Sequence, residues 1–284
     1  MRIVLDVENT VTKRNGKTHM DPFEPTNFLV QVGTKDVDSN ERHLLTFDHL
    51  EYSDRTGANA ELLQSLLDKT TLLIMHNAQH DLMWLWASGF KYDGEIYDTM
   101  LAEYILQRGQ KQPVSLLACA ERRNLNFQKD DTLKNYFKEG YNTNEIPLNE
   151  LTHYLGCDID TTTELFHAIN SEGYSQSCSN GMDRVRAITC EVCQTLTKMY
   201  MSGFRVDRVA LQRVREEFEQ EKADIERRLV TQIRDLMGDT PINLNSPEQV
   251  SQVIFSRSVK DKKEWADLFE FTSNLPEFRD AVAA

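Results

Sequence analysis

The chain has 284 residues, with 45 Asp and Glu against 32 Lys and Arg and a formal net charge of −13 at pH 7. This length exceeds the usual size of one domain, so we expect one large domain and a smaller appendage. The sequence has no apolar run that could span a membrane and no basic-then-apolar leader, which argues against a membrane protein and favours a soluble, cytoplasmic one.

The cysteines indicate reduced thiols. There are five, an odd number without framework spacing: Cys119, Cys157, Cys178, Cys190 and Cys193. Cys190 and Cys193 form a C-x-x-C pair inside a helical pattern, but no second pair accompanies them. We therefore prefer two small buried residues on one helix face to a zinc site.

The N-terminal half alternates strand-like and helix-like stretches. Apolar, β-rich runs predict strands at residues 2–5, 27–33, 43–47 and 71–75, the second and third as a meander. Helical spacing predicts helices over residues 59–67, 81–87, 98–106, 114–123 and 149–167. This pattern predicts an α/β or α+β domain, which we place at residues 1–175.

Strand signals vanish after a stretch of turn-forming residues at 171–181. Long helical periodicity covers residues 182–201 and 206–237, with Ser202-Gly203-Phe204 between them. Ser246 followed by Pro247 predicts one more helix start, because Ser caps helices and Pro fits their first position. We therefore expect a smaller all-α region over residues 182–284.

Asp6 and Glu8 lie at the end of the first apolar strand. Residues two apart in a strand face the same side, so the two carboxylates project together. Like charges at such a place are costly unless a cation neutralises them. A metal site is one interpretation of the pair, and a solvated strand end is the other.

Two later segments add acids in similar settings. Asp81 stands near the start of a helix that directly follows the strand at 71–75, where it could also simply complement the helix dipole. Tyr154 and Asp158 are four apart and share one helix face, whereas Asp160 points away from that face. A phenol beside a metal-bound carboxylate can orient a water, although the spacing alone is common.

The order of these motifs is informative. A D-x-E on a first strand, an N-x-x-x-D after a later strand and a Y-x-x-x-D on a late helix together resemble the DEDDy branch of DnaQ-like 3′–5′ exonucleases. The resemblance implies a ribonuclease-H-like core with a mixed central sheet flanked by helices. It also implies that two Mg²⁺ or Mn²⁺ ions are held by Asp6, Glu8, Asp81 and Asp158, with Tyr154 positioning the nucleophilic water.

Asn77 matches the asparagine of the family's second motif. Two residues depart from the family pattern. His80 precedes Asp81 where Phe or Tyr is usual, and Asn9 follows Glu8 where Thr is frequent. Both departures leave the metal ligands intact and concern contacts with the substrate.

Three further stretches are similar to family A DNA polymerases. Residues 97–106 resemble a segment of the proofreading domain, in which Asp98 and Thr99 start a helix. Residues 199–207 and 242–250 resemble the start of the thumb, although a helical hairpin with a Gly turn is an alternative. The palm and fingers motifs are absent from this sequence, so we expect no polymerase activity from this chain alone. It is similar to the front part of such a polymerase, as a natural split subunit of the kind some phages use or as a truncated product.

The resemblance implies a metal-dependent exonuclease that releases mononucleotides from single-stranded or frayed DNA 3′ ends, with Asn77 and His80 binding substrate and His80 stacking on a base. Lys13, Arg14 and Lys17 follow the first motif in an expected loop, where solvation is favoured over phosphate contact. The acid excess itself is unusual for such an enzyme, because phosphate contacts use clustered cations. The implied partner is a palm-and-fingers polypeptide or the missing C-terminal part, in the cytoplasm (the host's, if phage-encoded).

Two alternatives remain open. A ribonuclease of the RNase D type shares the four acids and the tyrosine, but the thumb-like segment argues against it. A non-catalytic subunit that docks a polymerase through its helical tail is the other, and the intact set of five site residues argues against that.

Overall fold

The structure is a computed structural model that describes residues 1–125, 132–171, 181–237, 243–247 and 249–251. The chain forms two compact units, Met1–Gly203 and Phe204–Ala284. None of the described helices combines the length and the apolar character that crossing a bilayer requires.

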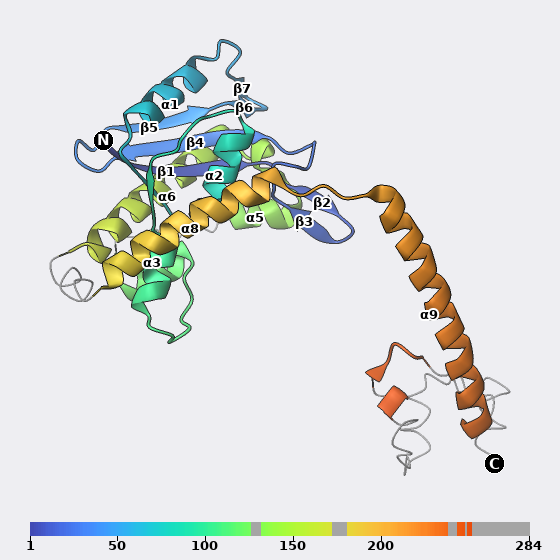
Figure 1. Ribbon diagram of the computed structural model, residues 1–284. Coiled ribbons are helices and arrows are strands. Elements are labelled where there is room, and N and C mark those ends of the chain that lie inside the picture. Colours follow the sequence, from blue (N-terminus) through green and yellow to red (C-terminus); the bar gives the residue numbers. More distant parts are fainter. Residues whose placement is uncertain (126–131, 172–180, 238–242, 248, 252–284) are drawn as a thin grey trace. The chain divides into compact units, whose positions relative to one another are not determined.

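A five-stranded mixed sheet forms the centre of the first unit (Figure 1). Its order is β5 (Arg42–Thr46), β4 (Leu29–Asp36), β1 (Arg2–Asn9), β8 (Leu72–Met75) and β9 (Glu95–Asp98). β1 pairs antiparallel with β4 and parallel with β8, and β9 continues the parallel side. The mixed central sheet and the β4–β5 meander expected from the sequence are therefore confirmed.

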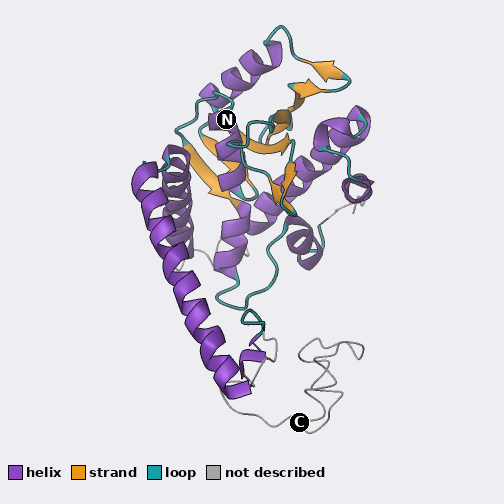
Figure 2. Cartoon of the chain, turned by 90° about the vertical axis from the view of Figure 1, so that its right-hand side faces the viewer, coloured by secondary structure: helices purple, strands orange, loops and turns teal. Residues whose placement is uncertain are grey.

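Helices cover both faces of this sheet (Figure 2). One core contains odd-numbered β1 residues such as Leu5, packed with residues of α1 (Ala58–Lys69), α2 (Ala78–Ala87) and α8 (Met182–Ser202). The other core contains Val4, packed with residues of α3 (Thr99–Leu106), α4 (Leu116–Arg122) and α6 (Leu148–Ile169). Because alternate strand residues face opposite sides, Asp6 and Glu8 share the face of Val4 and α6.

Several short elements were not predicted. Residues 12–19, expected as a loop, form the hairpin of β2 (Thr12–Arg14) and β3 (Lys17–His19). Its turn residues Asn15 and Gly16 have φ of 53° and 70°, as a type I′ turn requires. The remaining short elements are β6 (Asp48–His49), β7 (Tyr52–Ser53), α5 (Thr132–Glu139) and the 3₁₀ turn η1 (Thr143–Glu145).

The boundary expected between residues 175 and 182 differs from the one observed. α8 belongs to the first unit, because one of its faces packs against α2, α3 and β9. Cys190 lies in the first core, Arg186 stacks 4.2 Å from the Tyr97 ring, and Lys198 pairs with Asp93 at 2.8 Å. The first unit therefore ends at Gly203, inside the region expected to be a separate helical part.

The second unit begins with the long helix α9 (Arg208–Met237). Ion pairs four residues apart line it, including Arg215–Glu219 at 2.8 Å, and they follow the alternating charges of the sequence. The predicted cap at Ser246 is confirmed, since its Oγ accepts the Gln249 N–H at 3.4 Å. The thumb-like prediction for residues 252–284 lies outside the described residues.

Candidate active site

Asp6 and Glu8 occupy the end of the central strand β1. Asp6 lies opposite Gly33 and Glu8 opposite Gln31, and the register with β4 shifts directly after Glu8. Burial and the charge of Asp158 raise the pKa of Asp6 to about 8. Burial and the charges of Asp6 and Asp158 raise the pKa of Glu8 well above its usual value. Ionisation of the two carboxyl groups is therefore unfavourable unless a cation lies near them.

Gly33 allows α6 to approach this strand end. A Cβ atom at Gly33 would lie 2.8 Å from Ile159 Cγ1 and 3.0 Å from Leu155 Cγ, closer than normal packing permits. The missing side chain lets α6 rest on the backbone of β4, opposite Asp6. Tyr154 and Asp158 flank these contact residues on the same helix. The glycine thus places both of them over the acids of β1.

Tyr154 and Asp158 are hydrogen-bonded to each other. Burial raises the pKa of Asp158 to about 6, although the hydrogen bond from Tyr154 opposes the rise. The pKa of Tyr154 is also raised, by burial and then by the charges of Asp158 and Glu8. The phenol therefore remains protonated and donates to Asp158.

The fourth acid, Asp81, lies on α2, the helix that follows β8. Asn77, which precedes this helix, has φ of 77°, a conformation that Asn tolerates better than most residues. Asp81 follows in the first turn and is 2% exposed, and its Oδ2 has no hydrogen-bond partner among the described residues. Burial, then the charges of Asp6, Asp98 and Glu8, raise the pKa of Asp81.

The set fits a divalent metal. Four carboxylates from β1, α2 and α6 interact electrostatically with one another, and carboxylate oxygens are the ligands that Mg²⁺ and Mn²⁺ prefer. Asp81 Oδ2 is a buried acceptor without a donor among the described residues, as expected of an atom that can bind a cation. Among the residues that the structure describes, no three His, Cys, Asp or Glu side chains already surround a common ion position, so binding requires side-chain rearrangement.

The two residues that depart from the family pattern contact each other. His80 Nε2 lies 2.9 Å from Asn9 Oδ1, which links α2 to the end of β1. His80 is half-buried, and burial lowers its pKa. The structure thus shows His80 tied to Asn9, where the sequence suggested an exposed ring for stacking. The Asn77 side chain, in contrast, is exposed.

Asp98 holds the start of two helices, α3 and α2, and the sequence predicted only its contact with α3. Its carboxylate caps α3, as predicted, by accepting from Met100 N at 2.8 Å. It also accepts from Asn77 N at 3.2 Å and Ala78 N at 2.9 Å, at the start of α2. Asp98 therefore fixes the helix that carries Asp81. The helix-start pattern in the sequence predicted the Asp98 cap on α3. It did not predict the contact of Asp98 with the start of α2, because that contact depends on the neighbouring strand β8.

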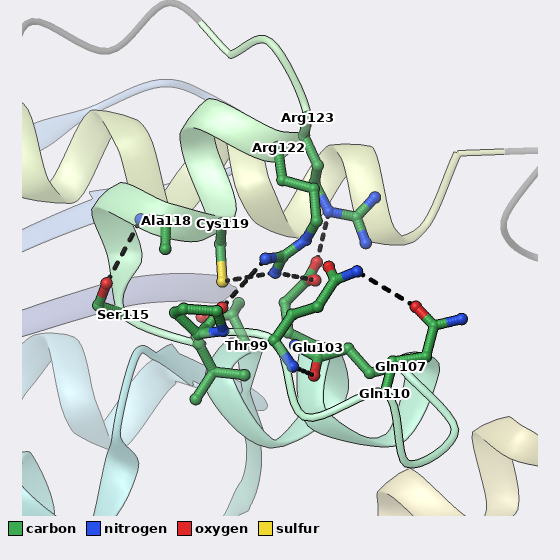
Figure 3. Close-up of polar contacts among 12 residues, drawn as sticks. Thr99, Glu103, Gln107, Gln110, Ser115, Ala118, Cys119, Arg122 and Arg123 are labelled. Atoms are coloured by element: carbon green, nitrogen blue, oxygen red, sulfur yellow. Dashed lines mark hydrogen bonds and ion pairs between the residues drawn. The ribbon is translucent and has the colours of Figure 1, made fainter.

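A buried cluster of ion pairs joins α4 to α3. Arg122 and Arg123 both reach the carboxylate of Glu103, which is 2% exposed, and Arg122 Nη2 lies 3.0 Å from Glu103 Oε2 (Figure 3). Arg122 also lies 3.3 Å from Cys119 Sγ. Removing one partner of such a buried pair leaves an uncompensated charge, so the cluster fixes α4 against α3.

Comparisons with known proteins identify the family of the matched segment. Residues 18–173 match the model of a family described as 3′–5′ exonuclease. Asp6 and Glu8 precede the matched segment. A DNA polymerase I from Chloroflexus aurantiacus is 26% identical over 185 residues, which cover 64% of this chain and 18% of that relative.

Two solved structures share the fold. The POL domain of Pol1 from M. smegmatis, in complex with DNA primer-template and dNTP, has a TM-score of 0.58 at 18% identity. The match covers 99% of this chain and 44% of that one. NrnC of Brucella melitensis bound to pGG has a TM-score of 0.50 at 14% identity, over 73% of this chain and 88% of that one.

The family match covers more than half of the chain and includes Asp81, Tyr154 and Asp158. The chain therefore belongs to the 3′–5′ exonuclease family, and it is related to DNA polymerase I.

Proposed function

We propose that the chain is a metal-dependent 3′–5′ exodeoxyribonuclease that removes mononucleotides from single-stranded or frayed DNA ends, in a proofreading role during replication. The observation that supports this most is the meeting of acids from three elements. Burial raises the pKa of all four acids, Asp6 and Glu8 on β1, Asp81 on α2 and Asp158 on α6. The charge of Asp158 adds to the rise at Asp6 and Glu8, the charge of Asp6 adds to the rise at Asp81, and Tyr154 is hydrogen-bonded to Asp158.

In this proposal the four carboxylates hold two Mg²⁺ or Mn²⁺ ions. When bound, such a pair activates water and stabilises charge on the attacking and leaving oxygens. Tyr154, still protonated at neutral pH, donates its hydroxyl proton to Asp158 and can hold a water by its oxygen lone pair. Asp98 holds the start of α2, so Asp81 keeps its place relative to β1.

Digestion of 5′-labelled single-stranded DNA in the presence of Mg²⁺ tests the proposal. The unaltered chain is expected to give a ladder of products that shorten by one nucleotide. Asp6→Ala and Asp158→Ala are each expected to abolish the ladder. Asp160→Ala is the matched control, because Asp160 pairs with Lys35 at 2.7 Å and Arg42 at 3.0 Å instead of facing the site. A ladder that persists in both site variants would refute the assignment.

DNA as the substrate is part of the proposal, with an RNase D-like exoribonuclease as the alternative. The relation to DNA polymerase I favours DNA. Cleavage of DNA and RNA oligomers of equal length separates the two, since a faster reaction on RNA would favour the alternative.

We also infer a polymerase partner. The chain spans 18% of the length of the polymerase I relative, so a palm-and-fingers part would come from another polypeptide or from a longer chain. A non-catalytic docking subunit would co-purify with such a protein and digest nothing. We infer a cytoplasmic location, where cysteine thiols remain reduced.

A further inference from the structure

A surface next to the acids combines cations with exposed rings. The β2–β3 hairpin and the loop that follows it are tied together by Asn27. Its Nδ2 donates to His19 O at 3.0 Å and to Asp21 O at 3.1 Å, and its Oδ1 accepts from Thr12 Oγ1 at 2.7 Å. The hairpin and loop therefore form one ordered projection.

Met20 connects this projection to the candidate active site. Its carbonyl oxygen accepts from Trp84 Nε1 at 3.1 Å on α2 and from Asn9 Nδ2 at 3.4 Å on β1. Asn9 directly follows Glu8 in β1. The projection is thus hydrogen-bonded to the residue next to Glu8.

Two aromatic rings and a methionine are exposed on the same surface. Phe23 of the loop and Tyr200 near the end of α8 have ring centroids 5.8 Å apart, and Figure 1 shows this end of α8 beside the hairpin. Met20, Phe23 and Tyr200 are 50%, 50% and 53% exposed. Exposed aromatic faces stack on bases with little regard to sequence, for about 1–3 kcal/mol per base.

The hairpin supplies positive charge beside these rings. Lys13, Arg14 and Lys17 are all exposed. Lys13 and Lys17 form no ion pair with any residue that the structure describes, and Arg14 lies 3.7 Å from Glu24. In a chain with a net charge of −13, these cations give one short hairpin a charge of opposite sign. Arg14 and Lys17 are paired across the two strands and share one side of the hairpin, and Lys13 lies on the other side.

We propose that this hairpin–aromatic surface, defined as Arg14, Lys17, Met20, Phe23 and Tyr200, binds the single strand of nucleic acid that leads into the active site. The rings stack on bases while the cations contact the backbone phosphates. A protein partner would match the exposed apolar groups, but the cations favour a polyanion. The metal ions that the acids would hold in the proposed function would bring the end of that polyanion to the site. This inference rests on the proposed exonuclease function.

The dissociation constant of a 5′-fluorescein-labelled oligodeoxythymidine of about ten nucleotides tests directly whether this surface binds single-stranded DNA. Ca²⁺ replaces Mg²⁺ in this assay to limit hydrolysis. Phe23→Ala and Tyr200→Ala are each expected to raise Kd by about fivefold or more, the loss of one stacked base. Lys17→Ala should lower the slope of log K against log salt by about 0.7.

Two exposed positions elsewhere in the first unit provide matched controls. Tyr104→Ala removes a ring that is 63% exposed on α3, and Lys69→Ala removes an exposed cation at the end of α1. Neither should change Kd or the salt slope. Thermal unfolding of all variants should match that of the unaltered chain, since all the altered residues are exposed.

Digestion kinetics separate this inference from the proposed function. KM of Phe23→Ala should rise most for long strands, and the effect should shrink as the strand is shortened to a dinucleotide, with kcat nearly constant. If the unaltered chain digests DNA but Phe23→Ala and Lys17→Ala bind like it, the surface assignment is wrong and the exonuclease proposal stands. If the unaltered chain digests no strand, the exonuclease proposal itself fails.

Discussion

At the scale of single residues, the hydrogen bond between Asn9 and His80 is the contact that links the first two acidic motifs. Asn9 Nδ2 lies 2.8 Å from Thr10 O and 3.4 Å from Met20 O, two acceptors that only an amide nitrogen satisfies. Its Oδ1 must therefore face His80, and His80 must donate from Nε2. Glu8 and Asp81 are the sequence neighbours of this pair, so their separation depends on it.

We predict that Asn9→Ala and His80→Leu each lower kcat and that the double variant loses little more than either single one. A buried neutral hydrogen bond contributes about 0.5–1.5 kcal/mol, so a double-mutant cycle on urea unfolding should give a coupling energy of that order. His80→Gln keeps an N–H donor and should retain most of the activity. Strictly additive losses would show that the two residues act independently.

The sequence predicted the grouping of acids better than it predicted their supports. Asp6 and Glu8 could be grouped because strand alternation places them on one side, and Tyr154 and Asp158 because of their helical spacing. The contact of Asp98 with the start of α2 and the Asn9–His80 contact could not be found this way. Their partners lie tens of residues away in the chain, and no periodic pattern connects them.

At the scale of elements, the packing of α6 on β4 decides whether the third motif reaches the first. Gly33→Ala places a Cβ atom 2.8 Å from Ile159, so the helix must shift. Overpacking of this kind costs about 1–3 kcal/mol in the free energy of unfolding, and kcat should fall as Tyr154 and Asp158 move away from β1. Urea unfolding and single-turnover digestion measure the two effects.

Gly156→Ala on the same helix is the matched control. Its Cβ would meet the end of the flexible Arg42 side chain at 3.4 Å and Leu44 Cδ1 at 3.6 Å, the latter an ordinary packing distance. Ala in place of Gly within a helix stabilises by up to about 1 kcal/mol. Equal losses in the two alanine variants would mean that close packing at Gly33 is not what positions α6.

The elements found from the sequence are those with strong periodicity. The apolar runs of β1 and β8 and the long α6 were predicted, since each is central and buried. The β2–β3 hairpin escaped prediction because exposed charged residues flank its Asn15-Gly16 turn and hide any alternation. From the sequence, α8 was assigned to the C-terminal helical region, because a turn-rich stretch precedes it. Its packing against α2 and α3 instead makes it part of the first unit.

At the scale of the whole molecule, the buried acids make stability depend on pH. Asp6 and Asp158 have folded-state pKa values of about 8 and about 6, both raised from 3.8. A raised pKa stabilises the fold at low pH, and this contribution is lost as the pH rises through the folded-state value. Without metal, the free energy of unfolding should therefore fall between about pH 4 and pH 8, by on the order of 3 kcal/mol for Asp158 alone.

Urea unfolding in EDTA at about pH 5 and about pH 8 tests this expectation. Asp158→Asn should flatten the pH dependence and should stabilise the metal-free protein at the higher pH. Mg²⁺ should restore stability, and more strongly at high pH, because cations compete with protons for the carboxylates. A metal-free protein that becomes more stable with rising pH would contradict the electrostatics described for the site.

The most direct test of the whole account is the number of Mn²⁺ ions that the chain binds, counted by electron paramagnetic resonance of free Mn²⁺ during a titration at neutral pH. The unaltered chain should bind two ions, Asp81→Asn should bind fewer, and Asp160→Asn should bind the same number as the unaltered chain. Equal binding by the unaltered chain and Asp81→Asn, or none by either, would show that the acids of β1, α2 and α6 do not form a metal centre.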